Sequence, residues 1–219
     1  MLTYNDIKRN DAINTYITKA DESLSALGYT EHSFAHVGLV ASRAEYILCS
    51  LGYDSHTIEL AKIASHLHDI GNIVNRKEHS QSGAVMAFRI LDKLEMPASD
   101  IATIVTAIGN HDEGTGEAVN AVAAALIIAD KSDVRRSRVR NRDFATFDIH
   151  DRVNYSVIES SLSINDEKTQ IILSLTIDTK ISPVIDYFEI FLNHMLMCKK
   201  AGKALGLEFK LNINNQPII

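Results

Sequence analysis

Apolar side chains recur at helical spacing along the first two thirds of the chain. Between residues 10 and 27 they stand three or four positions apart, at Ile13, Tyr16, Ile17, Ala20, Leu24 and Leu27. This spacing predicts an amphipathic helix, and the following Gly28 is typical of a helix end. The same pattern predicts further helices over residues 32–51, 55–70, 81–94, 99–110 and 120 to about 140. We therefore expect residues 1 to about 145 to be helical almost throughout.

The pattern changes after Asp151. Residues 153–165 and 169–179 alternate apolar with polar positions and are rich in Ile, Val, Ser and Thr, which predicts two strands joined by a hairpin turn at 165–168. An amphipathic helix over 185–205 and a strand over 206–214 follow. We expect a mostly α protein, with a helical domain over residues 1–150 and a small C-terminal α+β (ββαβ) module over residues 151–219.

The composition is that of an ordinary globular protein. The chain has 219 residues, of which 46% are hydrophobic and 23% charged. Its formal net charge of -6 argues against binding a nucleic-acid polymer. Cys49 and Cys198 lie in apolar helical runs, which favours reduced core thiols. We find no signal peptide and no apolar run of membrane-spanning length, and therefore expect a cytoplasmic protein with no membrane partner.

Six side chains of the helical part are candidate metal ligands. They are imidazoles and carboxylates, which suit Fe, Mn, Zn, Co or Ni rather than a thiolate site. Asp69 and Asp130 each end an apolar helical run, where a carboxylate is costly to bury unless it pairs with a cation. Because consecutive side chains point about 100° apart on a helix, one of the adjacent residues His68 and Asp69 could bind one ion while the other bridges to a second. The six candidates are His36, His68, Asp69, His79, His111 and Asp130.

The order of these residues resembles the signature of the HD-domain metal-dependent phosphohydrolases. The first histidine lies in HVGLV, the His-Asp pair in ASHLHDIG and the distal aspartate in IIADKSD. Two further segments, HSQSGAVMAFRIL and IGNHDE, are similar to the extra-histidine segments of the binuclear subset, which includes cyclic-nucleotide phosphodiesterases and cyclic-di-GMP hydrolases. The resemblance covers roughly residues 28–135 and implies an HD-domain helical bundle.

The resemblance also implies a ligand set of two parts. One divalent ion would be held by His36, His68, Asp69 and Asp130. Asp69 would bridge to a second ion that His79 and His111 complete, and a mononuclear site would result if either histidine pointed away. His68 and Asp69 would be the catalytic residues, and a water shared by the two ions could ionise near pH 7 to give a hydroxide nucleophile.

Three departures from the cyclic-di-GMP hydrolases argue against that substrate. Asn72 stands where those enzymes have the lysine of HDIGK, and His111-Asp112 stands where they have paired histidines. Residues 113–116, Glu-Gly-Thr-Gly, carry no Gly-Tyr-Pro motif. The sequence therefore indicates a different small phosphorylated substrate.

The densest basic run of the chain begins directly after Asp130. If the helix continues through it, Lys131, Arg135 and Arg138 share one face beside Asp130 and could bind a substrate phosphate. Asp133, Arg136 and Arg140 would then share another face and could pair with one another. The alternative is a solvated helix end, where cations favour the helix dipole.

Other polar residues near the ligands are open to two interpretations. Asp112 or Glu113 could protonate a leaving group, although a solvated loop charge is more common. His32 could line the pocket, or it could have a surface or capping role. His66 is expected to pack or to make a supporting hydrogen bond. The remaining histidines, which are expected to be structural or exposed, are His56, His150 and His194.

Two other functions compete with a phosphohydrolase. The binuclear pattern is similar to that of HD-domain oxygenases, which cleave C–C or C–P bonds at a di-iron centre and would show iron-dependent, air-sensitive activity. A non-catalytic nucleotide-binding sensor is the second alternative, although the full ligand set argues against it. The C-terminal module could cap the pocket or form a homodimer interface, and the sequence does not choose between them.

Overall fold

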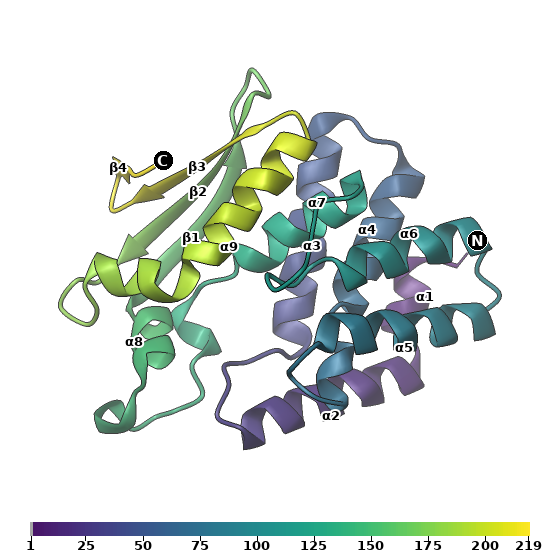
Figure 1. The fold of residues 1–219 in the computed structure, drawn as a ribbon, viewed down its shortest axis with the longest axis horizontal. Helices are drawn as coiled ribbons and strands as arrows, with labels where there is room; N and C mark the ends of the chain where they lie inside the picture. Colours follow the sequence, from purple (N-terminus) through teal and green to yellow (C-terminus); the bar gives the residue numbers. More distant parts are fainter. Residues whose placement is uncertain (1) are drawn as a thin grey trace.

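A computed structural model describes residues 2–219 as a bundle of helices with a small sheet on one side (Figure 1). The helical part contains α1 (Tyr4–Lys8), α2 (Asp11–Ala26), α3 (Phe34–Leu51), α4 (Ser55–Leu67), α5 (His79–Lys93), α6 (Ala98–Gly109) and α7 (Ala121–Lys131), with a 3-10 turn η1 (Ile70–Ile73). The C-terminal part contains η2 (Arg136–Arg138), η3 (Phe144–Thr146), α8 (Ile149–Ser156), β1 (Val157–Ile164), β2 (Gln170–Ile177), α9 (Val184–Ala204), β3 (Glu208–Ile213) and β4 (Gln216–Pro217). The predicted fold class is confirmed.

Side-chain caps fix where the principal helices begin. Asn10 accepts hydrogen bonds from two backbone N–H groups of α2, and Ser33, Asp54 and Asn120 cap α3, α4 and α7 in the same way. Gly52 ends α3 in the left-handed conformation, with φ of 81°. The helices expected over residues 10–27, 32–51, 81–94 and 99–110 therefore form close to their predicted limits.

The helix expected to run from residue 120 to about 140 is shorter than predicted. It ends at Lys131, and the next residues turn away. The Ser132 hydroxyl donates to the Ala129 carbonyl, and the Arg138 guanidinium donates to the Asp133 carbonyl at 2.8 Å. These bonds use a carbonyl in the last turn of the helix and a carbonyl of the loop that follows it. The basic run therefore forms a loop with one 3-10 turn, and the helical faces predicted for it do not form.

The sheet of residues 2–219 has the strand order β1-β2-β3-β4. β1 and β2 form an antiparallel hairpin, and α9 crosses back so that β3 pairs parallel to β2. One sheet face is apolar, with Leu173 on β2 and Leu211 on β3 fully buried. Figure 1 shows α9 between this face and α7, and the buried apolar core continues from α3 and α7 through α9 to the sheet. The division into two domains near residue 150 stays a prediction.

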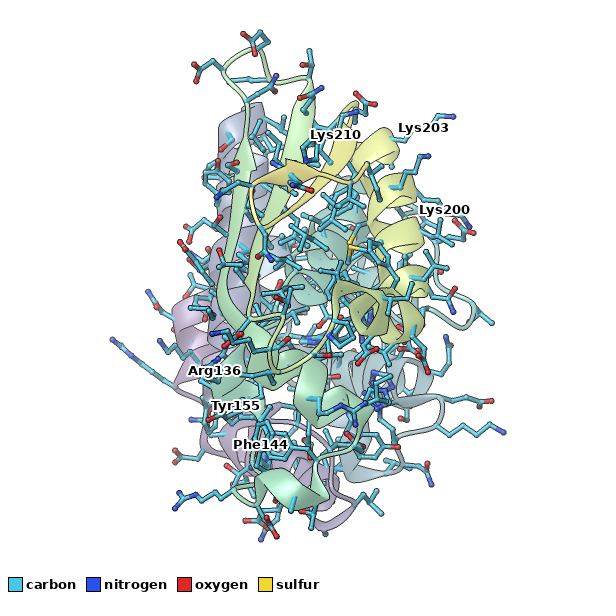
Figure 2. The ribbon with its side chains drawn as sticks, turned by 90° about the vertical axis from the view of Figure 1, so that its left-hand side faces the viewer. Arg136, Phe144, Tyr155, Lys200, Lys203 and Lys210 are labelled. Atoms are coloured by element: carbon cyan, nitrogen blue, oxygen red, sulfur yellow. The ribbon has the colours of Figure 1, made fainter. Side chains whose placement is uncertain are left out.

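Residues 153–156 were expected to open a strand, but they belong to α8. The Asp148 carboxylate caps this helix by accepting from the Asp151 N–H at 2.8 Å. At its other end Arg136 donates to the Tyr155 carbonyl at 2.6 Å and lies over the Tyr155 ring, with Phe144 beside that ring (Figure 2). These contacts hold the segment as a helix and delay the strand until Val157.

The two cysteines are free but differ in burial. Cys198 is fully buried, as expected, whereas Cys49 is exposed, so the expectation of a core thiol is wrong for Cys49. Cys49 lies on the outward side of α3 despite the apolar residues around it in the sequence. No helix within residues 2–219 is both long enough and apolar enough to cross a membrane.

Candidate metal centre

The six candidate ligands converge because each lies in the first or last turn of a helix, or just beyond it. The ends of α3 to α7 meet in one place, and their ligand residues are His36 on α3, His68 and Asp69 after α4, His79 at the start of α5, His111 after α6 and Asp130 on α7. These helices also pack on one another: α3, α4 and α7 contact each other, and α6 contacts α4, α5 and α7. The histidines are almost completely buried, at 0–2% exposure.

His36, His68 and Asp130 form the first set of ligand atoms. The Nε2 atoms of His36 and His68 lie 3.3 Å apart, and Asp130 Oδ1 lies 3.3 Å from the first and 3.6 Å from the second. Asp69 Oδ2 completes the set, at 3.6 Å from His36 Nε2 and 3.3 Å from His68 Nε2. Ligands bound at about 2.1 Å from one ion are about 3.0–3.5 Å apart in octahedral or tetrahedral geometry. The separations in this set therefore fit a single divalent ion.

The other oxygen of Asp69 belongs to a second set of ligand atoms. Asp69 Oδ1 lies 3.3 Å from His79 Nε2 and 4.0 Å from His111 Nε2. The two imidazole Nε2 atoms are 3.1 Å apart. Arg76 Nη1 also donates to His79 Nε2 at 3.3 Å, so this guanidinium must shift for a cation to bind His79. Asp69 thus presents one oxygen to each set.

All four histidines are oriented so that Nε2 is the free ligand atom. His36 Nδ1 lies 2.7 Å from Asp133 Oδ2. The Nδ1 atoms of His68, His79 and His111 lie 2.7, 3.0 and 2.6 Å from backbone carbonyls of Ser65, Arg76 and Ile108. Each Nδ1 must carry a proton, so Nε2 is the nitrogen that presents a lone pair to the cluster when the ring is neutral. The Nε2 atoms of His36 and His68 lie close together, and so do those of His79 and His111. The lone pairs within each pair of atoms repel unless a cation lies between them, so the donor set fits a metal.

The charges of the cluster favour the binding of cations. Burial disfavours a charged His68, but the carboxylates of Asp69 and Asp130 raise the pKa of this imidazole to about 10. Burial would also raise the pKa of Asp133, yet the Arg138 guanidinium and the His36 hydrogen bond hold it below its ordinary value. A divalent ion competes with protons for the same negative field, which makes metal affinity depend on pH.

Gly71 allows the two sets of ligands to lie close together. It belongs to η1, two residues after Asp69, and its Cα lies against the backbone at the start of α5. A Cβ at this position would overlap the carbonyl oxygen of His79. The absence of a side chain at Gly71 therefore lets α5 bring His79 up to Asp69.

Two connected chambers give access to the ligands. The inner chamber has a volume of about 390 Å³, counting its open mouth, and is lined by His32, Asp69, Arg76, His79, His111, Asp130, Lys131, Asp133, Val134, Arg138, Phe191 and His194. The outer chamber is larger, at about 1140 Å³ on the same basis, and its remaining walls come from residues 27–30, from Asp148 to Asn154 and from α9. His32, Arg76, Arg138, Phe191 and His194 line both chambers and so mark the passage between them.

A chain of ion pairs and hydrogen bonds leads from Asp130 to the C-terminal part. Lys131 Nζ lies 3.0 Å from Asp130 Oδ2 and 3.0 Å from Glu113 Oε2. His194 Nε2, on α9, lies 3.0 Å from Glu113 Oε1. Burial opposes ionisation of Glu113, but the hydrogen bond from His194 and the Lys131 ammonium lower the pKa of this carboxyl. Glu113 is therefore an anion that holds Lys131, which does not suit the proposed role of a proton donor.

The three cations predicted to bind substrate are separated by the structure. Lys131 and Arg138 line the inner chamber, although they do not share a helical face. Arg135 lies outside the lining of both chambers, where it pairs with Asp133 at 2.7 Å and with Glu31 at 3.2 Å. The pairs expected for Asp133 with Arg136 and Arg140 do not form, because Asp133 contacts His36 and Arg135.

Sequence reasoning missed several residues of the chambers. Arg76 lines both chambers, and its position three residues before His79 in the sequence was a signal that could have found it. Asp133 orients His36 across 97 residues of sequence, which no local pattern reveals. His194 was expected to be structural or exposed; the structure places it, with Phe191, in the chamber walls, where it also pairs with Glu113.

The remaining histidines take separate places. His32 lines the inner chamber, one of the two positions foreseen for it. His66 is buried and packs edge-on against Tyr4, while neither of its ring nitrogens has a hydrogen-bond partner among the described residues. His56 pairs with Asp100 at 3.0 Å, and His150 lies in the wall of the outer chamber.

Comparison with known proteins agrees with this geometry. The HD domain family matches residues 33–152, which is more than half of the chain. The "Uncharacterized protein MJ1020" of Methanocaldococcus jannaschii is 26% identical over 190 residues, covering 76% of this chain and 73% of the relative. The crystal structure of a predicted HD superfamily hydrolase from an uncultured Thermotogales bacterium is similar with a TM-score of 0.45 and 23% identity, covering 57% of this chain and 67% of that one.

The chain therefore belongs to the HD domain family. HD domains bind divalent metals, and the His/Asp clusters of this chain could hold them. Neither relative fixes a substrate for this chain.

Proposed function

We propose that this chain is a metal-dependent phosphohydrolase that cleaves a phosphate ester of a small molecule. The observation that carries the proposal is the position of Asp69, whose two oxygens face two separate sets of imidazole Nε2 atoms. A carboxylate shared in this way suits two divalent ions about 3.5–4 Å apart. We infer that His36, His68, Asp69 and Asp130 hold one ion and that His79, His111 and Asp69 hold the other.

Two divalent ions supply an activated water at neutral pH and neutralise the oxygens of a phosphate. The chain's own residues would position the ester. Arg76 and Arg138 lie at the passage between the chambers, where guanidinium groups suit phosphate oxygens. Lys131 adds a third positive charge to the inner chamber. Because Asp130 and Glu113 hold it from two sides, Lys131 offers this charge from a fixed position.

The sizes of the chambers support a small substrate with its phosphate innermost. The inner chamber is narrow and bears most of the charged side chains, whereas the outer chamber is about three times larger and includes apolar walls at Leu27, Ile190 and Phe191. We infer that the phosphate enters the inner chamber and that the rest of the ester lies in the outer one.

The proposal is tested by metal analysis and a substrate screen on the same preparation. Bound metal is measured by mass spectrometry, and phosphate monoesters and diesters are screened with Mn²⁺, Fe²⁺, Co²⁺ or Ni²⁺ added back. We expect two ions per chain and metal-dependent phosphate release. His79→Ala should keep one ion, and Asp69→Asn should lower activity at least about 100-fold. Asp100→Asn is the matched control, since Asp100 pairs with His56 away from the cluster.

Two results would overturn the proposal. An Asp69→Asn protein with wild-type phosphatase activity would remove the shared carboxylate from the reaction. Iron-dependent oxygen consumption without phosphate release would assign the same ligand set to an HD-type oxygenase instead.

A further inference from the structure

The outward side of α9 carries a pattern that the metal centre does not use. Its members stand three or four residues apart and so lie along one side of the helix: Ile185, Glu189, Leu192, Leu196, Lys199 and Lys203. We call them the α9 stripe. Leu192 and Leu196 are 49% and 50% exposed, and Ile185 is 69% exposed. The other side of α9 is already committed to the core, where residues such as Tyr187 and Met195 are buried.

The charged members of the stripe have no ion-pair partner among the described residues. Among residues 2–219, Glu189, Lys199 and Lys203 form no ion pair, whereas the neighbouring Lys200 binds Glu117 at 2.8 Å. Figure 2 shows Lys200 and Lys203 projecting from α9 away from the sheet. Along the stripe, one acidic residue thus precedes the two exposed leucines, and two basic residues follow them.

This order is complementary to itself in one orientation. If a second copy of α9 lies antiparallel to the first, with a two-fold axis that crosses the stripe midway between Leu192 and Leu196, Leu192 faces Leu196 of the partner subunit. Glu189 then faces Lys199 of the partner subunit, because both are five residues from the axis. A parallel pairing would instead set like charges against each other. The two-fold arrangement repeats each contact twice, as an isologous interface requires.

We propose that the chain forms a homodimer through antiparallel pairing of the α9 stripe. Exposed leucines supply the apolar centre and the Glu189–Lys199 pairs select the orientation. A contact centred on one helix from each copy is smaller than a standard interface of about 1,600 Å², so a dissociation constant in the micromolar range is expected. The proposal is independent of the reaction, because the stripe faces away from the side of α9 that bears His194.

Sedimentation velocity over about 1–200 μM protein tests the dimer. We expect Glu189→Lys alone and Lys199→Glu alone to raise the dissociation constant at least about 10-fold, because each creates two like-charge contacts. An equimolar mixture of the two variants should recover the dimer. One variant then offers only lysines at the two charged positions and the other only glutamates, so both contacts of the mixed pair are attractive.

The controls separate dimerisation from folding. Glu167→Lys changes the same charge in the exposed hairpin turn and should leave the dissociation constant unchanged. Circular dichroism of each single variant should match that of the wild type. A wild-type chain that stays monomeric at the highest concentration overturns the proposal. So does a dimer that Glu189→Lys does not weaken, or a mixture of the two variants that remains monomeric.

Discussion

His36 Nδ1 and Asp133 Oδ2 lie 2.7 Å apart, and both side chains are buried. The bond joins the start of α3 to the loop after α7. Since the Asp133 carboxylate accepts a hydrogen bond from the Nδ1–H of His36, it fixes both the orientation of the ring and its tautomer. The same contact ties the loop that follows α7 to the first turn of α3, so it serves both the fold and the site.

Asp133→Asn is expected to weaken metal binding about 10- to 100-fold, because an amide is a poorer acceptor and no longer enforces the His36 tautomer. Competition with a chelator of known affinity measures the change. Asp166→Asn, in the exposed hairpin turn, is the matched control. Unchanged affinity in Asp133→Asn would show that the metal alone orients His36.

His194→Ala is expected to lower kcat/KM about 10-fold while leaving the metal content intact. Loss of the His194 Nε2 hydrogen bond frees Glu113, which then holds Lys131 less firmly. A hydrogen bond to a charged group contributes about 1.5 kcal/mol or more of net free energy. His194→Gln, which keeps an N–H donor, should recover part of the loss. This prediction rests on the proposed function, and a purely structural role for His194 would give no recovery with Gln.

Arg76→Gln is expected to raise KM for a phosphorylated substrate about 10- to 100-fold, since it removes a charge-assisted hydrogen bond at the passage between the chambers. Steady-state kinetics with saturating metal measures the change. Arg142→Gln is the matched control, because Arg142 is exposed on the loop after η2. An equal change in both variants would assign the effect to overall charge.

His66 is expected to make the protein less stable in acid. Burial, with Lys8 and His68 nearby, lowers the pKa of this imidazole to about 4, below its ordinary value near 6.5. Above about pH 6.5 both folded and unfolded states hold a neutral ring, so there is no effect. Between pH 6.5 and 4 only the unfolded state takes the proton, and the free energy of unfolding falls by up to about 3 kcal/mol.

Urea unfolding of wild type and His66→Leu at fixed metal concentration isolates this contribution. The difference in unfolding free energy between the two proteins should change by up to about 3 kcal/mol from pH 7 to pH 4, in the direction that favours the variant in acid. His56→Gln should track the wild type, because the His56 side chain is 44% exposed. A difference that stays constant with pH would contradict the prediction.

The sequence sufficed for the elements that follow local rules. Helical spacing located α2 to α6, and the alternation of residues 169–179 located β2. The order of the histidines and aspartates pointed to the HD domain family, and family membership is confirmed. The six candidate ligands also lie together, because the helix ends that carry them meet in one place.

The remaining features depend on contacts between distant segments. The helix ends at Lys131, and Arg138, seven residues further along the chain, donates to the Asp133 carbonyl, so the expected face of three cations does not form. His194 entered the chambers only because α9 packs on α7 with that side inward. The exposure of Cys49 likewise depends on which side of α3 the other helices leave uncovered.

Gly71 gives this ligand arrangement an unusual point of control. A single added methyl group there would act as a wedge between η1 and α5, and the ligand it would displace is His79 rather than His36 or His68. The first set of ligands would stay assembled while the second opened. A residue that has no ligand atom of its own could therefore decide whether the second set assembles, and a descendant of this chain could lose that set while it keeps every candidate ligand.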